Sequence, residues 1–308
     1  MDTQPTPEQQ ALLDAVAPML AKAAAPPKEG LVYDYDQDLD DDLVASGFHD
    51  LARTEGYGLA DAALIVELVS GALKVVEAGA TMLVAPGLDL DLPHPIALVA
   101  DARRPARFLS VARSAIVLDD GGAVALELQP GQTETADGIF AYPMGRFTSP
   151  VTPTEGVRLS RPMVRKLMSI WRLSLALEAA GAMRGALDFT VEYVKTRRQF
   201  NRAIGSYQAL QHRLAERTVA AKATRLLALQ AAWSGDPAHA ALAATYAQGA
   251  IPAVIHDCQQ FNGANGVTYE HPLHYWTFRL AALQGELGGV SAQAQAAAEL
   301  LWGQDESP

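Results

Sequence analysis

The chain has 308 residues, of which 49% are hydrophobic and 19% charged, so it can form a packed core and is not disordered throughout. Its 24 Lys and Arg against 35 Asp and Glu give a formal net charge of −11, which argues against binding to nucleic acid or to an anionic membrane surface. The single cysteine, Cys258, excludes an intramolecular disulfide and a metal cluster built from cysteines, and it fits a reduced, cytoplasmic location. Neither a secretory signal nor a transmembrane helix is expected.

Three helices are expected in the first ninety residues. Thr6 and Gln9 have the spacing of a capping box at the start of the first helix, which Pro26-Pro27 should end. Apolar residues at helical spacing predict two more helices, over Asp40–Arg53 and Leu59–Glu77.

The hydrophobic period changes in the middle of the chain. Ala115–Leu118 and Ala123–Leu128 flank a glycine-rich turn and predict a β-hairpin. Pro95–Ala100 and Gly138–Tyr142 are further strand candidates. The β segment covers only Leu92–Leu159, so it can form a small sheet but not a large domain.

The rest of the chain is rich in alanine, which favours helices that pack closely. The sequence predicts a mainly α fold with a small β insert, divided into an N-terminal helical part (1–91), a short β part (92–159) and a C-terminal four-helix bundle (160–308). The four helices of the bundle are expected over Arg161–Arg198, Tyr207–Trp233, Ala238–Gln260 with a kink at Pro252, and Pro272–Trp302.

Two segments of the C-terminal half resemble the acyl-CoA dehydrogenase family. The first keeps the order Tyr193, Arg197-x-x-Phe200, Ile204 and Gln208. The second, Gln260–Leu273, follows the family pattern Gln-x-x-Gly-Gly-x-Gly-x-Thr-x-Glu-x-Pro-Leu with one glycine changed. The resemblance implies the family's fold, with N-terminal helices, a middle β domain and a C-terminal helical bundle.

The same resemblance implies an FAD site shared across a subunit interface. Arg197 would contact the pyrophosphate of the neighbour's FAD, since a guanidinium matches phosphate oxygens well. Phe200 would pack near the flavin, and Gln208, Gln260 and Gly263 would contribute beside it, the last where a backbone approaches phosphate closely. The alternatives are a helix-terminal arginine favoured by the helix dipole, a core phenylalanine and an ordinary inter-helix loop.

The chain also departs from the family pattern. Its β segment is about half the usual length and lacks the Thr-Glu-Pro-x-x-Gly-Ser-Asp stretch. The catalytic base should be an unpaired carboxylate that removes the acyl α-proton, but gapless alignment places Leu287 at that position. Its neighbour Glu286 is the remaining candidate, about 100° away on a helix, and the family's alternative base position holds Trp171. Asn201 and Ala264 replace two motif glycines.

By this resemblance, the residues that a subunit lends to its neighbour's FAD are mostly kept, whereas those that serve its own flavin and substrate are mostly missing. This resembles the short subunit of the heteromeric (α2β2) acyl-CoA dehydrogenases of bacterial steroid side-chain degradation. It implies a full-length homologous partner that holds the acyl-CoA and supplies the base, with an electron-transfer flavoprotein as acceptor. A self-sufficient homomeric dehydrogenase that uses Glu286 and a flavin-free structural partner remain as alternatives.

The sequence predicts no metal site. The acidic run from Asp34 to Asp42 resembles a calcium loop, but its sixth position is Leu39 and its twelfth is Ala45, where such loops have Gly and Glu. His256 beside Asp257, like the histidine pair at 271 and 274, has no third ligand nearby in the sequence.

Overall fold

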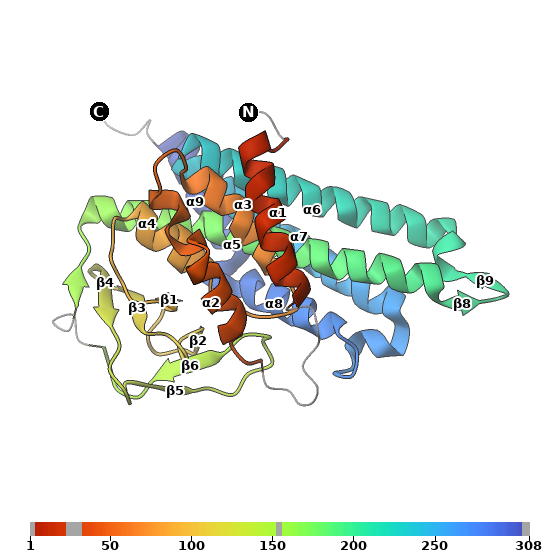
Figure 1. The fold of residues 1–308 in the computed structure, drawn as a ribbon, viewed down its shortest axis with the longest axis horizontal. Helices are drawn as coiled ribbons and strands as arrows, with labels where there is room; N and C mark the ends of the chain where they lie inside the picture. The colour runs from red at the N-terminus through yellow and green to blue at the C-terminus, as the bar shows by residue number, and fades with distance from the viewer. Residues whose placement is uncertain (1–3, 23–32, 152–155, 304–308) are drawn as a thin grey trace.

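The computed structural model describes residues 4–22, 33–151 and 156–303 (Figure 1). Helices dominate, and two small sheets lie together at one side of the molecule. In the described residues, no helix combines the length and apolar character needed to cross a membrane. The mainly α fold with a small β insert is confirmed.

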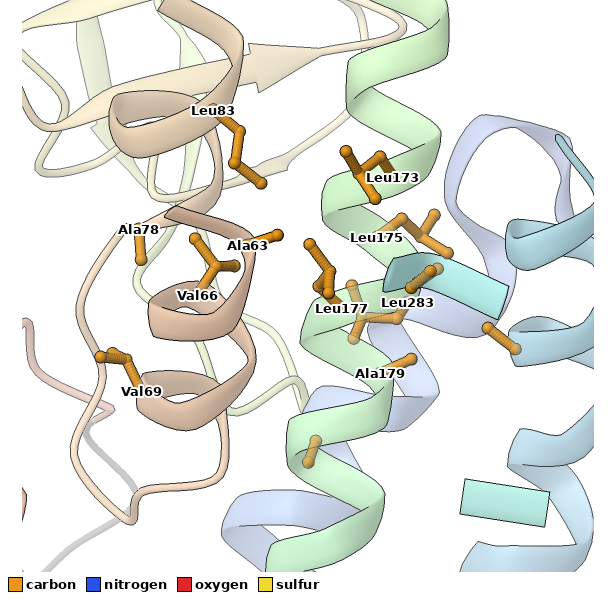
Figure 2. Close-up of a cluster of buried hydrophobic side chains, with 14 of the residues drawn as sticks. Ala63, Val66, Val69, Ala78, Leu83, Leu173, Leu175, Leu177, Ala179 and Leu283 are labelled. Carbon is orange, nitrogen blue, oxygen red and sulfur yellow. The ribbon is translucent and has the colours of Figure 1, made fainter. Parts of the chain in front are cut away.

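The C-terminal bundle is organised around one long helix, α5 (Arg161–Thr196). The antiparallel helices α6 (Gln208–Ser234) and α7 (Pro237–Asn262) follow it, and α7 is continuous through Pro252. In Figure 2 the leucines of α5 meet side chains of α3 on one side and of α8 on the other, so the core of the bundle continues into the N-terminal helices.

The N-terminal helices are α1 (Pro7–Lys22), α2 (Gln37–Ala45) and α3 (Leu59–Ser70). The capping box of α1 is confirmed by reciprocal hydrogen bonds between Thr6 and Gln9 at 3.1 and 3.2 Å. The proline pair at 26–27 lies outside the described residues.

Two of the predicted N-terminal helices are too long. The one over Asp40–Arg53 is divided at Gly47, whose φ of 77° ends α2 before a 3₁₀ turn (Phe48–Arg53). The one over Leu59–Glu77 ends at Ser70, because Gly71–Lys74 form a turn and bends and Val75 then pairs with Tyr35. The backbone N–H of Asp36 donates to the Val75 carbonyl at 2.8 Å. The predicted continuation of this helix from Gly71 to Glu77 is therefore wrong.

The first sheet has the strand order β1-β3-β4-β7. The predicted hairpin is confirmed, with Asp119 opposite Gly122 across its turn, and β1 runs parallel to β3. The strands are β1 (Ile96–Val99), β3 (Ser114–Asp119), β4 (Gly122–Glu127) and β7 (Val157–Arg158).

The second sheet is β2 (Ala106–Arg107), β6 (Met144–Phe147) and β5 (Thr133–Thr135). The strand predicted over Gly138–Tyr142 is wrong, because these residues form bends and β6 begins two residues later. Tyr142 is buried, and the guanidinium carbon of Arg107 lies 4.7 Å from the centre of its ring.

The helix predicted over Pro272–Trp302 is two helices, α8 (Leu273–Gly285) and α9 (Gly289–Trp302). Leu287, Gly288 and Gly289 have φ values of 53°, 88° and 73°, which reverse the chain between them. Glycine adopts positive φ without strain, so Gly288 and Gly289 allow this reversal, whereas Leu287 is strained there.

We expect Gly181→Ala to destabilise the fold, because α3 and α5 touch at this glycine. A methyl group at Gly181 would lie 2.2 Å from the Glu67 carbonyl oxygen, so the helices would have to separate, at a cost of about 1–3 kcal/mol. The matched control is Gly249→Ala in α7, where the nearest atom would be 3.7 Å away and better helix propensity should stabilise by about 0.5–1 kcal/mol. In urea unfolding, the free energy of unfolding should fall for Gly181→Ala and rise for Gly249→Ala. Equal changes in both variants would contradict the close approach of α3 and α5 at Gly181.

Candidate functional site

The end of the C-terminal bundle carries an exposed, protruding hairpin. Helix α5 ends at Thr196 with Arg197 as its C-cap, and the chain then forms β8 (Arg198–Gln199) and β9 (Arg202–Ala203). Figure 1 shows this hairpin extending beyond the helices. We call the hairpin, with the adjacent start of α6 and end of α7, the bundle tip.

The bundle tip is basic although the chain is acidic overall. The exposed side chain of Arg197 makes no hydrogen bond or ion pair with any described residue. Arg198 donates to the carbonyl of Asn201 at 3.3 Å, and the guanidinium of Arg202 lies 3.7 Å from the ring centre of Tyr207. Exposed guanidinium groups of this kind are suited to a phosphate or a carboxylate.

The turn of the hairpin presents an aromatic ring to solvent. Phe200 is 86% exposed, so the interpretation of this residue as part of the core is wrong. Phe200 and Asn201 have φ values of 51° and 64°. An asparagine tolerates this region, which explains why it stands where the family has glycine, but a bulky residue there is strained. Strain together with exposure is typical of functional positions.

The other predicted cofactor residues lie at the same end of the bundle. Gln208 is exposed at the start of α6, and Gln260 is exposed in the last turn of α7. Gly263 ends α7 with φ 64° and ψ −147°, a backbone region that essentially requires glycine.

Two polar contacts hold these elements together. Asn262 donates to the Thr190 hydroxyl at 3.0 Å, which joins the end of α7 to α5, and Asp257 accepts from Arg213, which joins α7 to α6. All five predicted cofactor residues thus lie at the same end of the bundle: Arg197, Phe200, Gln208, Gln260 and Gly263.

Glu286 does not belong to the bundle tip. Its carboxylate lies in a polar network inside the molecule, where Arg107 of β2 donates Nε to Oε2 at 2.8 Å and Nη2 to Oε1 at 3.1 Å. Trp171 of α5 donates its indole N–H to Oε1 at 2.6 Å. Arg107 also donates Nη1 to Oε2 of Glu178 on α5 at 2.7 Å. Because an α-helix rises 1.5 Å per residue, Glu178 lies roughly 30 Å along the helix from Arg197.

We call Arg107, Trp171, Glu178 and Glu286 the Arg107 network. Arg107 and the two glutamates are almost completely buried, with side chains 11–13% exposed. Burial by itself would lower the pKa of Arg107, but the two carboxylates outweigh it and the pKa lies well above its ordinary value. One fixed positive charge therefore faces two acidic side chains, which is the arrangement that a buried arginine requires.

The segment that carries Glu286 is fixed from several sides. Gln248 of α7 donates to the carbonyl of Glu286 at 2.8 Å, and Gln293 of α9 donates to that of Leu287 at 2.7 Å. Glu286 itself has an extended backbone, with φ −64° and ψ 144°. Its expected place on a continuous helix, including the 100° offset, is therefore wrong, and its side chain is only 13% exposed.

A further buried acid, Glu77, lies in the same region and was missed by the sequence analysis. Its carboxylate accepts from the backbone N–H groups of Ala80 and Thr81 and from the Thr81 hydroxyl, at 2.5–3.1 Å. Burial raises the pKa of Glu77 to about 7, with a contribution from the charge of Glu178. A lone acid within the apolar run 75–80 was the available signal in the sequence.

Comparisons with known proteins agree with this architecture. A family model described as "Acyl-CoA dehydrogenase, C-terminal domain" matches residues 162–298. The chain is 30% identical over 298 residues to the Mycobacterium tuberculosis protein "Acyl-CoA dehydrogenase IpdE2", covering 88% of this chain and 90% of the relative.

Solved structures have the same fold. A chain of the ChsE4–ChsE5 complex from Mycobacterium tuberculosis superposes with a TM-score of 0.81 at 22% identity, over 100% of both chains. A chain of a steroid ACAD, Tcur3481–Tcur3483, superposes with a TM-score of 0.76 at 22% identity, over 95% of this chain and 97% of that chain.

The raised pKa of Glu77 predicts a pH dependence of stability. The pKa is 4.5 ordinarily and about 7 in the folded chain, so the folded state binds this proton more tightly. The corresponding stabilisation is complete below about pH 4.5 and is lost as the pH rises to about 7, with an upper limit of about 3 kcal/mol.

Glu77→Gln removes the pH-dependent contribution of this side chain to the free energy of unfolding. Any destabilisation caused by the amide itself does not depend on pH. Urea unfolding between pH 5 and pH 8 should show the free energy of unfolding falling more steeply in the wild type than in the variant. Parallel curves would show that Glu77 is ionised in the folded chain throughout this range.

Proposed function

Because the chain belongs to the acyl-CoA dehydrogenase family, we propose that it acts in an FAD-dependent oxidation of an acyl-CoA to the 2-enoyl-CoA. It does so as one subunit of a heteromeric enzyme. It lends binding residues to an FAD shared with a larger homologous partner, and the partner supplies the catalytic base.

The observation that carries the subunit role is the engagement of Glu286. A base that removes an α-proton needs a carboxylate oxygen free to face the substrate carbon. Both oxygens of Glu286 instead accept hydrogen bonds from Arg107 or Trp171, at 2.6–3.1 Å. Glu286 is thus a structural member of the Arg107 network in this proposal.

The bundle tip supports the cofactor half of the proposal. Arg197 is an exposed guanidinium without a partner among the described residues, which fits one phosphate of a pyrophosphate. Phe200 offers an exposed ring for a planar group or its linker, and Gln208 and Gln260 offer amide groups nearby. Nothing lies within 4 Å of a Cβ built at Gly263, so its backbone is open to a ligand. FAD, when bound, would supply the hydride acceptor.

The named relatives support the substrate and the partner. One solved structure is a complex of two named chains, and another is a steroid ACAD. A bulky acyl-CoA, such as a steroid side-chain thioester, held mainly by a full-length homologous partner is the proposed substrate. An electron-transfer flavoprotein is the proposed electron acceptor, and the cytoplasm the proposed location.

The central test is flavin content. The chain is purified alone and after co-expression with a full-length homologue, and flavin absorbance and molar mass are measured for both preparations. We expect no flavin in the chain alone and about one flavin per heterodimer in the complex. Full flavin in the chain alone would support a homomeric enzyme. An active complex whose flavin content does not depend on this chain would support the role of a structural partner.

In the complex, Arg197→Ala should weaken FAD binding by about 10- to 100-fold, since a hydrogen bond to a charged group contributes about 1.5–3 kcal/mol. The matched control is Arg165→Ala, an exposed arginine near the other end of α5. Flavin retention is measured by dilution and ultrafiltration. Equal retention in both variants would remove Arg197 from the cofactor site.

Glu286→Gln distinguishes the subunit from a self-sufficient enzyme. If the partner supplies the base, kcat of the complex should change by less than about threefold and its pH profile should stay in place. Loss of a true base would lower kcat by about 10²–10⁴-fold. The melting temperature is measured in parallel, because the variant also weakens the Arg107 network, and a lower melting temperature with unchanged kcat is the expected pattern.

A further inference from the structure

Three side chains from separate segments converge at a place that the proposed function does not use. Asp40 lies on α2, His49 on the 3₁₀ turn (Phe48–Arg53), and His94 just before β1. Asp40 is 1% exposed and His49 is 7% exposed, whereas the His94 side chain is one-third exposed. The cluster therefore opens to solvent on the side of His94.

Within the described residues, the buried polar atoms of this cluster make no hydrogen bond of good geometry, although the Tyr35 hydroxyl interacts with the Asp40 carboxylate. This applies to both carboxylate oxygens of Asp40 and to both ring nitrogens of His49. A buried carboxylate without hydrogen bonds is costly unless a positive charge compensates for it. Among the described residues, the ion-pair partners of Asp40 are the two histidines.

The distances within the cluster fit a bound metal ion. His49 Nε2 lies 3.2 Å from Asp40 Oδ1, and His94 Nε2 lies 3.7 Å from Asp40 Oδ2. One ligand atom from each of the three residues can be chosen so that all lie within 4.8 Å of one another. A tetrahedral zinc ion with bonds of about 2.0–2.1 Å separates its ligand atoms by about 3.3 Å, so small side-chain adjustments complete the site.

We propose that Asp40, His49 and His94 bind a divalent transition-metal ion, with zinc as the best match. Two imidazoles and one carboxylate are a ligand set that suits zinc. A water molecule entering beside His94 would complete the coordination. The ion would join α2, the 3₁₀ turn and the start of β1, so its role would be to fix the N-terminal helices against the first sheet.

This inference revises the expectation of a chain without a metal site. Ligands that are close together in the sequence do not form a site here, since the acidic run 34–42 fails as a calcium loop. Of that run only Asp40 belongs to the site, and its two companions follow 9 and 54 positions later. The fold alone brings the three residues together.

A second histidine–aspartate pair shows what a compensated carboxylate looks like in this chain. His256 Nδ1 lies 3.0 Å from Asp257, but Asp257 is also paired with Arg213 and Arg217. No metal ion is needed there. The His256 side chain is 66% exposed, so it serves as a matched control for non-specific binding to a histidine.

The test uses the full chain, freed of any affinity tag and stripped of metal with a chelator. Zinc is titrated by calorimetry and cobalt by visible absorption, which reports coordination geometry. We expect one ion per chain with a tetrahedral cobalt spectrum, and a rise in melting temperature on zinc addition. Asp40→Asn, His49→Gln and His94→Gln should each weaken binding by at least about 10-fold, whereas His256→Gln should not.

His94→Gln is the deciding variant, because its partly exposed side chain is the least necessary for folding. Circular dichroism checks that it is folded. The proposal fails if the wild-type chain binds no stoichiometric zinc, if folded His94→Gln binds as well as the wild type, or if His256→Gln weakens binding equally.

Discussion

The placement of Arg107 constrains much of this structure. A buried guanidinium must be neutralised and hydrogen-bonded, and here it takes one carboxylate from α5 and another from the segment between α8 and α9. β2, the middle of the longest helix and the chain reversal at 286–289 are thereby fixed to one another. Since Trp171 donates to the same carboxylate, the network leaves Glu286 no free oxygen.

The middle and the C-terminal end of α5 consequently differ in character. Its middle lies in a satisfied polar network surrounded by apolar packing, whereas its C-terminal end carries unpaired charge and an exposed ring at the bundle tip. A chain that functioned alone would need an available carboxylate in its interior. The arrangement found here suits a chain that contributes an outer surface to a site completed by another subunit, which is the proposed role.

Much of the fold could be predicted from local pattern, because helix spacing, caps and the glycine turn are local signals. The errors arose where tertiary contacts outweighed them: Val75 pairs with Tyr35 instead of extending α3, and Gln248 and Gln293 hold the break after α8. The five residues proposed for the cofactor belong to two contiguous motifs, so the family resemblance could single them out in the sequence. The Arg107 network and the Asp40 cluster could not be predicted, because their members are far apart in the chain.

The hairpin at the bundle tip also has a consequence for a copy of the chain that has no partner. Its turn holds an aromatic ring 86% exposed on a strained backbone, at the point that projects farthest from the bundle. An exposed aromatic ring favours non-specific association, and an exposed turn is a preferred place for proteolytic cleavage of the backbone. An unassembled copy would be removed faster than an assembled one, so the cellular level of this chain would follow the supply of whatever covers the hairpin.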